Sequence, residues 1–172
     1  MIIVNTVKDH LRHKKTLLKL IDDFESLHDT RVVSDVENIS SDWETPKEAK
    51  KEYLEYFFNN VISETMDSIS QTLGLSSWIA HDAWYQRYSE QGTHDWHNHG
   101  KTQFANSYFL ELPDSTYKTE IVGSNGEIIE YDAKEGDVIT FPAWLKHRSK
   151  PNGKERKTII AFNSSFGLGK ND

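Results

Sequence analysis

The sequence predicts a mainly β fold, an antiparallel sandwich or barrel, with helices before it. Apolar residues recur at helical spacing through the first part of the chain, whereas short β-like runs broken by turn residues fill residues 78–166. The length of 172 residues is that of one ordinary domain. We therefore expect a single domain over residues 1–172, in which a helical part, residues 1–77, packs on a sheet structure formed by residues 78–166.

Two amphipathic helices are expected in the first part. Apolar residues at intervals close to 3.6 predict one over residues 8–25. The second begins at the Thr-Pro-Lys-Glu segment of residues 45–48, which combines an N-cap threonine, a proline at the first helical position and a glutamate three residues after the cap. Its apolar face continues to Leu73, and Gly74 supplies the C-terminal stop. Both helices are expected to pack on the sheet as a scaffold.

Short strands are predicted in the second part, at the spacing of a sandwich or barrel. They cover residues 78–88, 104–112, 117–122, 127–131, 138–141 and 158–163. The Asn152-Gly153 pair is the preferred sequence for a two-residue hairpin turn. With that turn, His147 lies opposite Thr158, and Arg156 becomes its diagonal neighbour, with the two Cβ atoms about 7–8 Å apart.

Charge and composition exclude several classes of function. Lys and Arg total 20 against 27 Asp and Glu, a net charge of −7. This balance argues against general nucleic-acid binding, because proteins that bind the phosphate backbone concentrate Lys and Arg. The absence of cysteine excludes disulfides, thiolate metal ligands and cysteine nucleophiles. No apolar run approaches the ~20 residues of a membrane-spanning helix. We therefore expect a soluble protein of the cytoplasm, a reducing compartment.

Three of the eight histidines, His94, His97 and His99, fall within six residues. Because side chains alternate between the two faces of a strand, His97 and His99 should share one face with Asp95, and His94 should point away. Two neutral imidazoles on one face can close on a metal ion. The His-x-His pattern alone is a weak signal for a metal, because paired surface histidines are common.

His147 strengthens the metal hypothesis, because it follows a predicted strand and a Phe-Pro-Ala-Trp bend at residues 141–144. Three ligands on one face of a metal leave positions free for a chelating cosubstrate and for oxygen. Arg156, near His147 in the predicted hairpin, would hold the distal carboxylate of a dicarboxylate. Iron(II) and 2-oxoglutarate meet both requirements.

Four blocks of the sequence resemble the 2-oxoglutarate/iron(II)-dependent oxygenases, and most closely the group often carried by phages. The blocks are His97-x-His99, Ser-Tyr-Phe-Leu-Glu-Leu-Pro at 107–113, Gly-Asp-Val-Ile-Thr-Phe-Pro-Ala-Trp-Leu-x-His at 136–147, and Arg156 with the later pair Phe162-Asn163. The resemblance covers about residues 84–165, and the block at 136–147 is its most specific part. It implies a double-stranded β-helix, or jelly roll, with a metal at one mouth.

Position by position, the resemblance also implies roles for individual residues. His97 and His147 match metal ligands, and Arg156 matches the residue that anchors 2-oxoglutarate. Tyr88 and Tyr108 match the aromatic positions that flank this cosubstrate.

The chain departs from the family at one ligand position. The superfamily has Asp or Glu two residues after the first histidine, where this chain has His99. The site is therefore either a three-histidine site of His97, His99 and His147, or one in which Asp95 supplies the carboxylate. The matching position favours His99.

The resemblance implies an oxygenase, most simply a hydroxylase, that consumes 2-oxoglutarate and molecular oxygen while it oxidises an unidentified substrate. A phage-encoded enzyme would act in the host cytoplasm, and a homodimer is compatible with the fold because jelly rolls often pair. Two alternatives stay open: a cupin-like metalloprotein with three histidines that does not use 2-oxoglutarate, and a non-catalytic phage jelly-roll binding module. The first binds metal without a spectral response to 2-oxoglutarate, and the second holds no metal.

Overall fold

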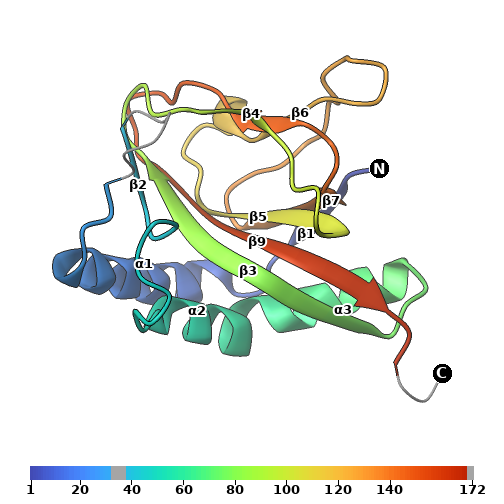
Figure 1. The fold of residues 1–172 in the computed structure, drawn as a ribbon, viewed down its shortest axis with the longest axis horizontal. Coiled ribbons are helices and arrows are strands. Elements are labelled where there is room, and N and C mark those ends of the chain that lie inside the picture. The colour runs from blue at the N-terminus through green and yellow to red at the C-terminus, as the bar shows by residue number, and fades with distance from the viewer. Residues whose placement is uncertain (32–37, 170–172) are drawn as a thin grey trace.

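The computed structural model describes residues 1–31 and 38–169 and has three layers: helices, a large sheet and a small sheet (Figure 1). The six strands of the large sheet are β1 (Ile3–Thr6), β7 (Asp137–Pro142), β5 (Phe104–Glu111), β9 (Lys157–Gly167), β3 (Ser77–Tyr88) and β2 (Ile39–Ser41), in that spatial order. The small sheet consists of β4 (His94–His97), β8 (His147–Ser149) and β6 (Glu120–Ile121). All neighbouring strands pair antiparallel.

The helices cover one face of the large sheet, and the small sheet faces the other (Figure 1). They are α1 (His10–Leu27), α2 (Glu52–Phe57), a π-helical turn η1 (Phe58–Ile62) and α3 (Ser63–Thr72), with a 3₁₀ turn, η2 (Ser115–Tyr117), later in the chain. None of the described helices combines the length and the apolar composition needed to cross a bilayer.

Both faces of the large sheet are therefore buried, and neighbouring residues of one strand belong to different layers. On β5, Tyr108 packs with the helices, whereas Phe109 packs with the small sheet. On β9, Ile160 points to the helices, and Ile159 and Ala161 point to the small sheet. Each buried apolar side chain of this size contributes about 1.5–3 kcal/mol. The candidate site lies on the small-sheet side.

The predicted first helix is confirmed as α1, with Leu17, Ile21 and Phe24 buried. The predicted start of the second helix at Thr45 is wrong, because α2 begins at Glu52. The hydroxyl of Thr45 donates instead to the backbone carbonyl of Asp42, 2.7 Å away, and so closes a turn.

The buried carboxylate of Asp42 explains why this turn is retained. It accepts hydrogen bonds from the backbone N–H of Tyr85 (3.0 Å) and the hydroxyl of Tyr53 (2.5 Å), and it forms an ion pair with Lys51 (2.9 Å). These contacts outweigh the local capping pattern. The predicted end of the second helix is confirmed, since α3 stops at Thr72 and Gly74 adopts a φ of 71°.

The strands predicted over residues 78–88, 104–112, 138–141 and 158–163 are confirmed as β3, β5, β7 and β9. The strand predicted over 117–122 is shorter, and that over 127–131 is wrong, because only an isolated bridge joins Ile128 to Val122. β1 and β2, within the part predicted as helical, are further differences. Both are short edge strands, which leave little periodicity to read.

The predicted hairpin at Asn152-Gly153 is also wrong, because β8 and β9 lie in different sheets. The buried side-chain amide of Asn152 donates to the carbonyls of Tyr88, Ser89 and Glu155 at 2.9–3.3 Å. The asparagine thus ties the crossing segment to the end of β3 and does not occupy the tip of a turn. Pairing of His147 with Thr158 is lost with the hairpin.

Candidate metal centre

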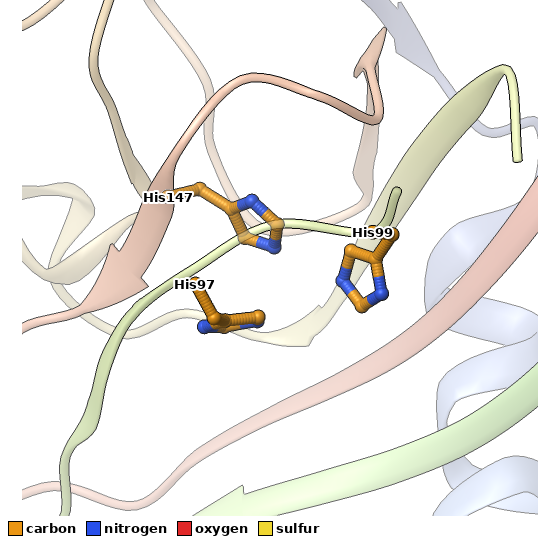
Figure 2. Close-up of side chains that lie close together, drawn as sticks. All are labelled: His97, His99 and His147. Atoms are coloured by element: carbon orange, nitrogen blue, oxygen red, sulfur yellow. The ribbon is translucent and has the colours of Figure 1, made fainter. Parts of the chain in front are cut away.

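Three imidazoles that are far apart in the sequence converge between the two sheets. His97 ends β4, His147 begins β8, and the two are register partners in the small sheet. His99 follows β4, and its backbone N–H donates to the carbonyl of Ala143 at 2.8 Å. One potential ligand atom from each histidine lies within 4.8 Å of the others. Figure 2 shows the three rings gathered around one space.

Backbone carbonyls fix the tautomers of two of these rings. Nδ1 of His97 lies 2.7 Å from the carbonyl oxygen of Asp95, and Nδ1 of His147 lies 3.1 Å from that of Leu145. A carbonyl oxygen only accepts, so each Nδ1 carries the proton, and each Nε2 keeps a free lone pair. This orientation by a second hydrogen bond is typical of metal-binding histidines.

Burial keeps the three imidazoles neutral. Desolvation lowers the pKa of His147 to about 3, with further lowering by the neighbouring His97. Desolvation likewise lowers the pKa of His99 to about 4 and lowers the pKa of His97. Neutral imidazole is the form that coordinates a metal ion. At neutral pH the cluster therefore presents three lone pairs and no charge.

The strand-parity prediction for His94 and Asp95 is wrong, because an irregularity interrupts the register between His94 and His97. His94 lines the same cleft, stacks on His97 with ring centroids 3.9 Å apart, and has its Nδ1 3.2 Å from Nε2 of Gln86. Asp95 is exposed and accepts a hydrogen bond from the backbone N–H of Trp96. Of the two ligands left open by the sequence, His99 is the one that lies with His97 and His147.

The cleft around the histidines is walled by aromatic and aliphatic side chains from the large sheet, among them Trp84, Phe141, Ile159 and Ala161. Trp84 packs against His99, with ring centroids 5.9 Å apart. Asn163 also lines the cleft, and among the described residues its buried Oδ1 has no hydrogen-bond partner. An apolar cleft with few polar groups is the usual form of a small-molecule site.

Tyr88, one of the two aromatic positions predicted to flank the cosubstrate, lies in this cleft and is buried. Burial raises its pKa, so the phenol stays neutral, and its hydroxyl donates to Oε1 of Gln86 at 2.7 Å. Tyr108, the other position, does not line the cleft. It points to the helical layer, where its hydroxyl is 2.5 Å from Nδ1 of His10. Its parity on β5 is opposite to that of Phe109, which explains the difference.

Arg156, the predicted cosubstrate anchor, also lies away from the histidines. Its guanidinium pairs with both carboxylate oxygens of Glu111 at 2.9 Å, and 46% of its side chain is exposed. It precedes β9 and has the parity of Thr158, which contacts the same Glu111. The predicted hairpin would have turned it inward, and its absence leaves Arg156 on the other side of the strand.

Lys157, the next residue, is the cation that sequence reasoning missed. It is 1% exposed, and its Nζ donates to Oγ of Ser149 and to the carbonyl of Tyr117 (3.0 Å) and lies 4.1 Å from the ring centroid of Tyr88. Tyr88 and Ser149 both line the histidine cleft. No carboxylate of residues 1–31 or 38–169 pairs with this amine. The sequence signal that could have identified Lys157 is its spacing of two residues from Ile159 and four from Ala161, which places all three on the same face of β9.

The structure is similar to many solved structures, among them those of three proteins. A 2OG-Fe(II) oxygenase family oxidoreductase from Burkholderia pseudomallei has a TM-score of 0.64 at 10% identity, covering 87% of this chain and 77% of its own. A viral collagen prolyl hydroxylase from Paramecium bursaria Chlorella virus-1, in complex with 2-oxoglutarate, has 0.58 at 14%, covering 96% of each chain. HygX from Streptomyces hygroscopicus, with nickel and 2-oxoglutarate bound, has 0.64 at 8%, covering 98% and 83%.

The fold is the double-stranded β-helix of the 2-oxoglutarate/iron(II) oxygenases. The predicted fold class, mainly β with helices before the jelly roll, is thereby confirmed. No protein-family model and no curated protein matches the sequence.

Proposed function

We propose that this protein is a non-haem iron(II)- and 2-oxoglutarate-dependent oxygenase, most simply a hydroxylase. The observation that carries the proposal is the convergence of His97, His99 and His147, with ligand atoms within 4.8 Å of one another, in the cleft of this fold. Three nitrogen ligands on one side leave the remaining coordination positions open, as oxygen-activating iron sites require.

The donor set fits iron(II). The three imidazoles are neutral, and the carbonyl contacts at Nδ1 of His97 and His147 leave Nε2 of each ring free to coordinate. Bound iron(II) would supply activation of molecular oxygen, with 2-oxoglutarate as the source of two electrons and with succinate and carbon dioxide as products. The protein's own part is to hold the ligands in fixed orientation and to keep water out with the walls around Trp84 and Phe141.

Lys157 takes the anchoring role in this proposal, in place of Arg156. A buried amine with only neutral partners is costly unless an anion meets it, and the distal carboxylate of 2-oxoglutarate is such an anion. The ring of Tyr88 and the hydroxyl of Ser149 lie beside the amine, and the Ser149 hydroxyl can donate to the same carboxylate. These contacts favour a dicarboxylate cosubstrate over a ligand that lacks a second carboxylate.

The cleft is narrow. Its free volume is about 30 Å³, which suits a metal ion or a single water better than a dicarboxylate. Binding of 2-oxoglutarate therefore requires side chains to move, and the cleft is lined by the long, polar Gln86 and Arg148. We expect their rotamers to change on binding, while the histidines keep their backbone-fixed orientation.

Succinate production tests the function. Protein supplied with iron(II), ascorbate, oxygen and 2-oxoglutarate should release succinate above the level of the His147→Ala variant, with or without a coupled substrate. A substrate panel should include proline-containing peptides, because a similar protein is a collagen prolyl hydroxylase, together with nucleotides and small metabolites. Iron binding without succinate from any member would contradict the proposal.

The all-histidine set also favours a second candidate, a cupin-like metalloprotein that does not use 2-oxoglutarate. His99 in the usual carboxylate position is the observation behind it. Lys157 distinguishes the two candidate functions, because only a site that binds a dicarboxylate provides this buried amine with a negatively charged partner. A Lys157→Met variant should lose 2-oxoglutarate affinity in the oxygenase, whereas the cupin-like protein has none to lose.

We also propose the domain organisation, the co-reactant, the location and the binding partners of the protein. A single domain is supported by the helices and the small sheet sharing the two faces of one large sheet. Molecular oxygen as co-reactant follows from the proposed chemistry. A cytoplasmic location is supported by the cysteine-free composition. Lack of nucleic-acid binding is supported by the net charge of −7. Size-exclusion chromatography with light scattering tests the homodimer.

A further inference from the structure

The candidate metal centre is short of negative charge. Among the described residues that line the cleft there is no Asp or Glu. Arg148, whose guanidinium pairs with Glu120 at 2.7 Å, lines the cleft, and the amine of Lys157 lies beside the cleft residues Tyr88 and Ser149. The three candidate ligands are uncharged. A divalent ion bound there would keep its full charge of +2.

Glu120 is engaged by Arg148, and neither Asp95 nor Asp82 is placed to supply the missing carboxylate. Asp95 is exposed, and its carboxylate accepts from the backbone N–H of Trp96 at 2.7 Å. Asp82, which acts on His99 only through space, is also exposed. His99 itself is held in place by its backbone hydrogen bond to Ala143 and by the ring of Trp84. The deficit of charge is therefore built into the fold.

A carboxylate ligand would offset one of the two charges of the ion before any cosubstrate arrived. With an imidazole in its place, the ion has a lower affinity for the empty site and a stronger attraction for an incoming anion. Two ligands that each favour the other's binding are coupled, and the coupling is reciprocal. The size of this coupling is set by Coulomb's law for charges a few ångströms apart, namely the metal ion, a carboxylate ligand and the anionic cosubstrate.

We propose that His99 makes metal retention depend on the anionic cosubstrate: the protein holds a divalent metal weakly alone and strongly when 2-oxoglutarate is bound. This inference rests on the proposed function, of which it specifies the order of assembly. The dicarboxylate supplies the negative charge that the protein does not. His99 determines this dependence, because a carboxylate at its position would lower the effect of 2-oxoglutarate on metal affinity.

The test is a metal titration without turnover. Cobalt(II) is used as the probe under anaerobic conditions, and its dissociation constant is measured by competition with a chromophoric chelator, with and without saturating 2-oxoglutarate. The quantity compared is the coupling factor, the ratio of the two dissociation constants. The variants are His99→Asp and His99→Glu, which restore a carboxylate, and His99→Gln, which is uncharged. Circular dichroism verifies that each variant is folded.

The coupling factor of the unmodified protein should exceed that of the carboxylate variants by about tenfold or more, the expected effect of one unit charge near the metal. His99→Gln should keep a large factor, because it is also neutral. Equal factors in the unmodified protein and both carboxylate variants would overturn the inference, as would a small factor in His99→Gln with metal still bound. Cobalt(II) binding that is unaffected by His147→Ala would instead overturn the proposed function.

Discussion

Binding of 2-oxoglutarate should be accompanied by proton uptake at Lys157. The amine is buried against the face of Tyr88, and its two hydrogen-bond acceptors, the Ser149 hydroxyl and the Tyr117 carbonyl, are neutral. Desolvation, and secondarily the charge of Lys150, lowers its pKa to about 7. A carboxylate bound beside it favours the charged form and returns the pKa toward the ordinary value of a lysine.

The expected uptake depends on pH in a defined way. With a pKa of about 7, roughly one tenth of the lysine is charged at pH 8, so a bound carboxylate that restores a pKa near 10 draws in about 0.9 proton. At pH 6 the amine is already about nine-tenths charged, and the uptake falls to about 0.1 proton. Lys157 also lines a separate cavity of about 150 Å³.

Calorimetry measures this uptake directly. The binding enthalpy of 2-oxoglutarate to cobalt(II)-loaded protein is compared in phosphate and in Tris, whose ionisation enthalpies differ, at pH 6 and pH 8. A Lys157→Arg variant is the control, since a guanidinium stays charged at both values of pH. The difference between the two proteins isolates the lysine from any proton released at the metal. Equal proton counts for both proteins at pH 8 would refute the reasoning.

Three further predictions follow from the same contacts. Arg156→Ala should change 2-oxoglutarate affinity by less than about twofold, because Arg156 does not line the histidine cleft and instead pairs with Glu111; calorimetry measures the affinity, and a tenfold loss would restore Arg156 as the anchor. Tyr108→Phe should lower the free energy of unfolding by about 1 kcal/mol through loss of the hydrogen bond to His10 and leave cobalt(II) affinity unchanged; urea unfolding and the chelator assay measure the two, and weakened metal binding would contradict its placement in the helical layer. Lys157→Met should stabilise the protein by about 2–4 kcal/mol at pH 7, because the pKa of Lys157 is lowered in the folded state and its buried charge therefore destabilises the fold. This destabilisation is complete below pH 7 and decreases as the pH rises toward 10.5, so urea unfolding should show a smaller stabilisation at pH 10 than at pH 7. An equal or larger stabilisation at pH 10 would be inconsistent with this account.

Long, periodic elements could be predicted from the sequence. The apolar positions of α1 recur often enough to identify both the helix and its buried face. The long β-like runs identify β3, β5 and β9 as strands, and β5 and β9 are buried on both faces. The start of α2 could not be predicted, because a distant backbone group decides it: the carboxylate of Asp42 binds the N–H of Tyr85, 43 residues away. Local capping signals do not record such contacts.

The candidate metal ligands were predicted from their spacing, and their neighbours were not. His97, His99 and His147 come together as expected, because β4 and β8 pair with His97 opposite His147, and His99 follows β4 directly. The prediction for His94 required a regular strand, and one irregularity reversed it. The predicted anchor required the Asn152-Gly153 hairpin. Because the chain crosses between sheets at that point, the inward cation is Lys157 and the outward one is Arg156.

The central claim is that the three histidines bind iron(II) and that 2-oxoglutarate then chelates this iron. Its most direct test is an anaerobic titration of the iron(II)-loaded protein with 2-oxoglutarate, followed by visible absorption. A charge-transfer band should grow to saturation with the cosubstrate in the unmodified protein and be missing in His147→Ala. A protein that retains iron(II) at these histidines and shows no band at saturating 2-oxoglutarate would contradict the account.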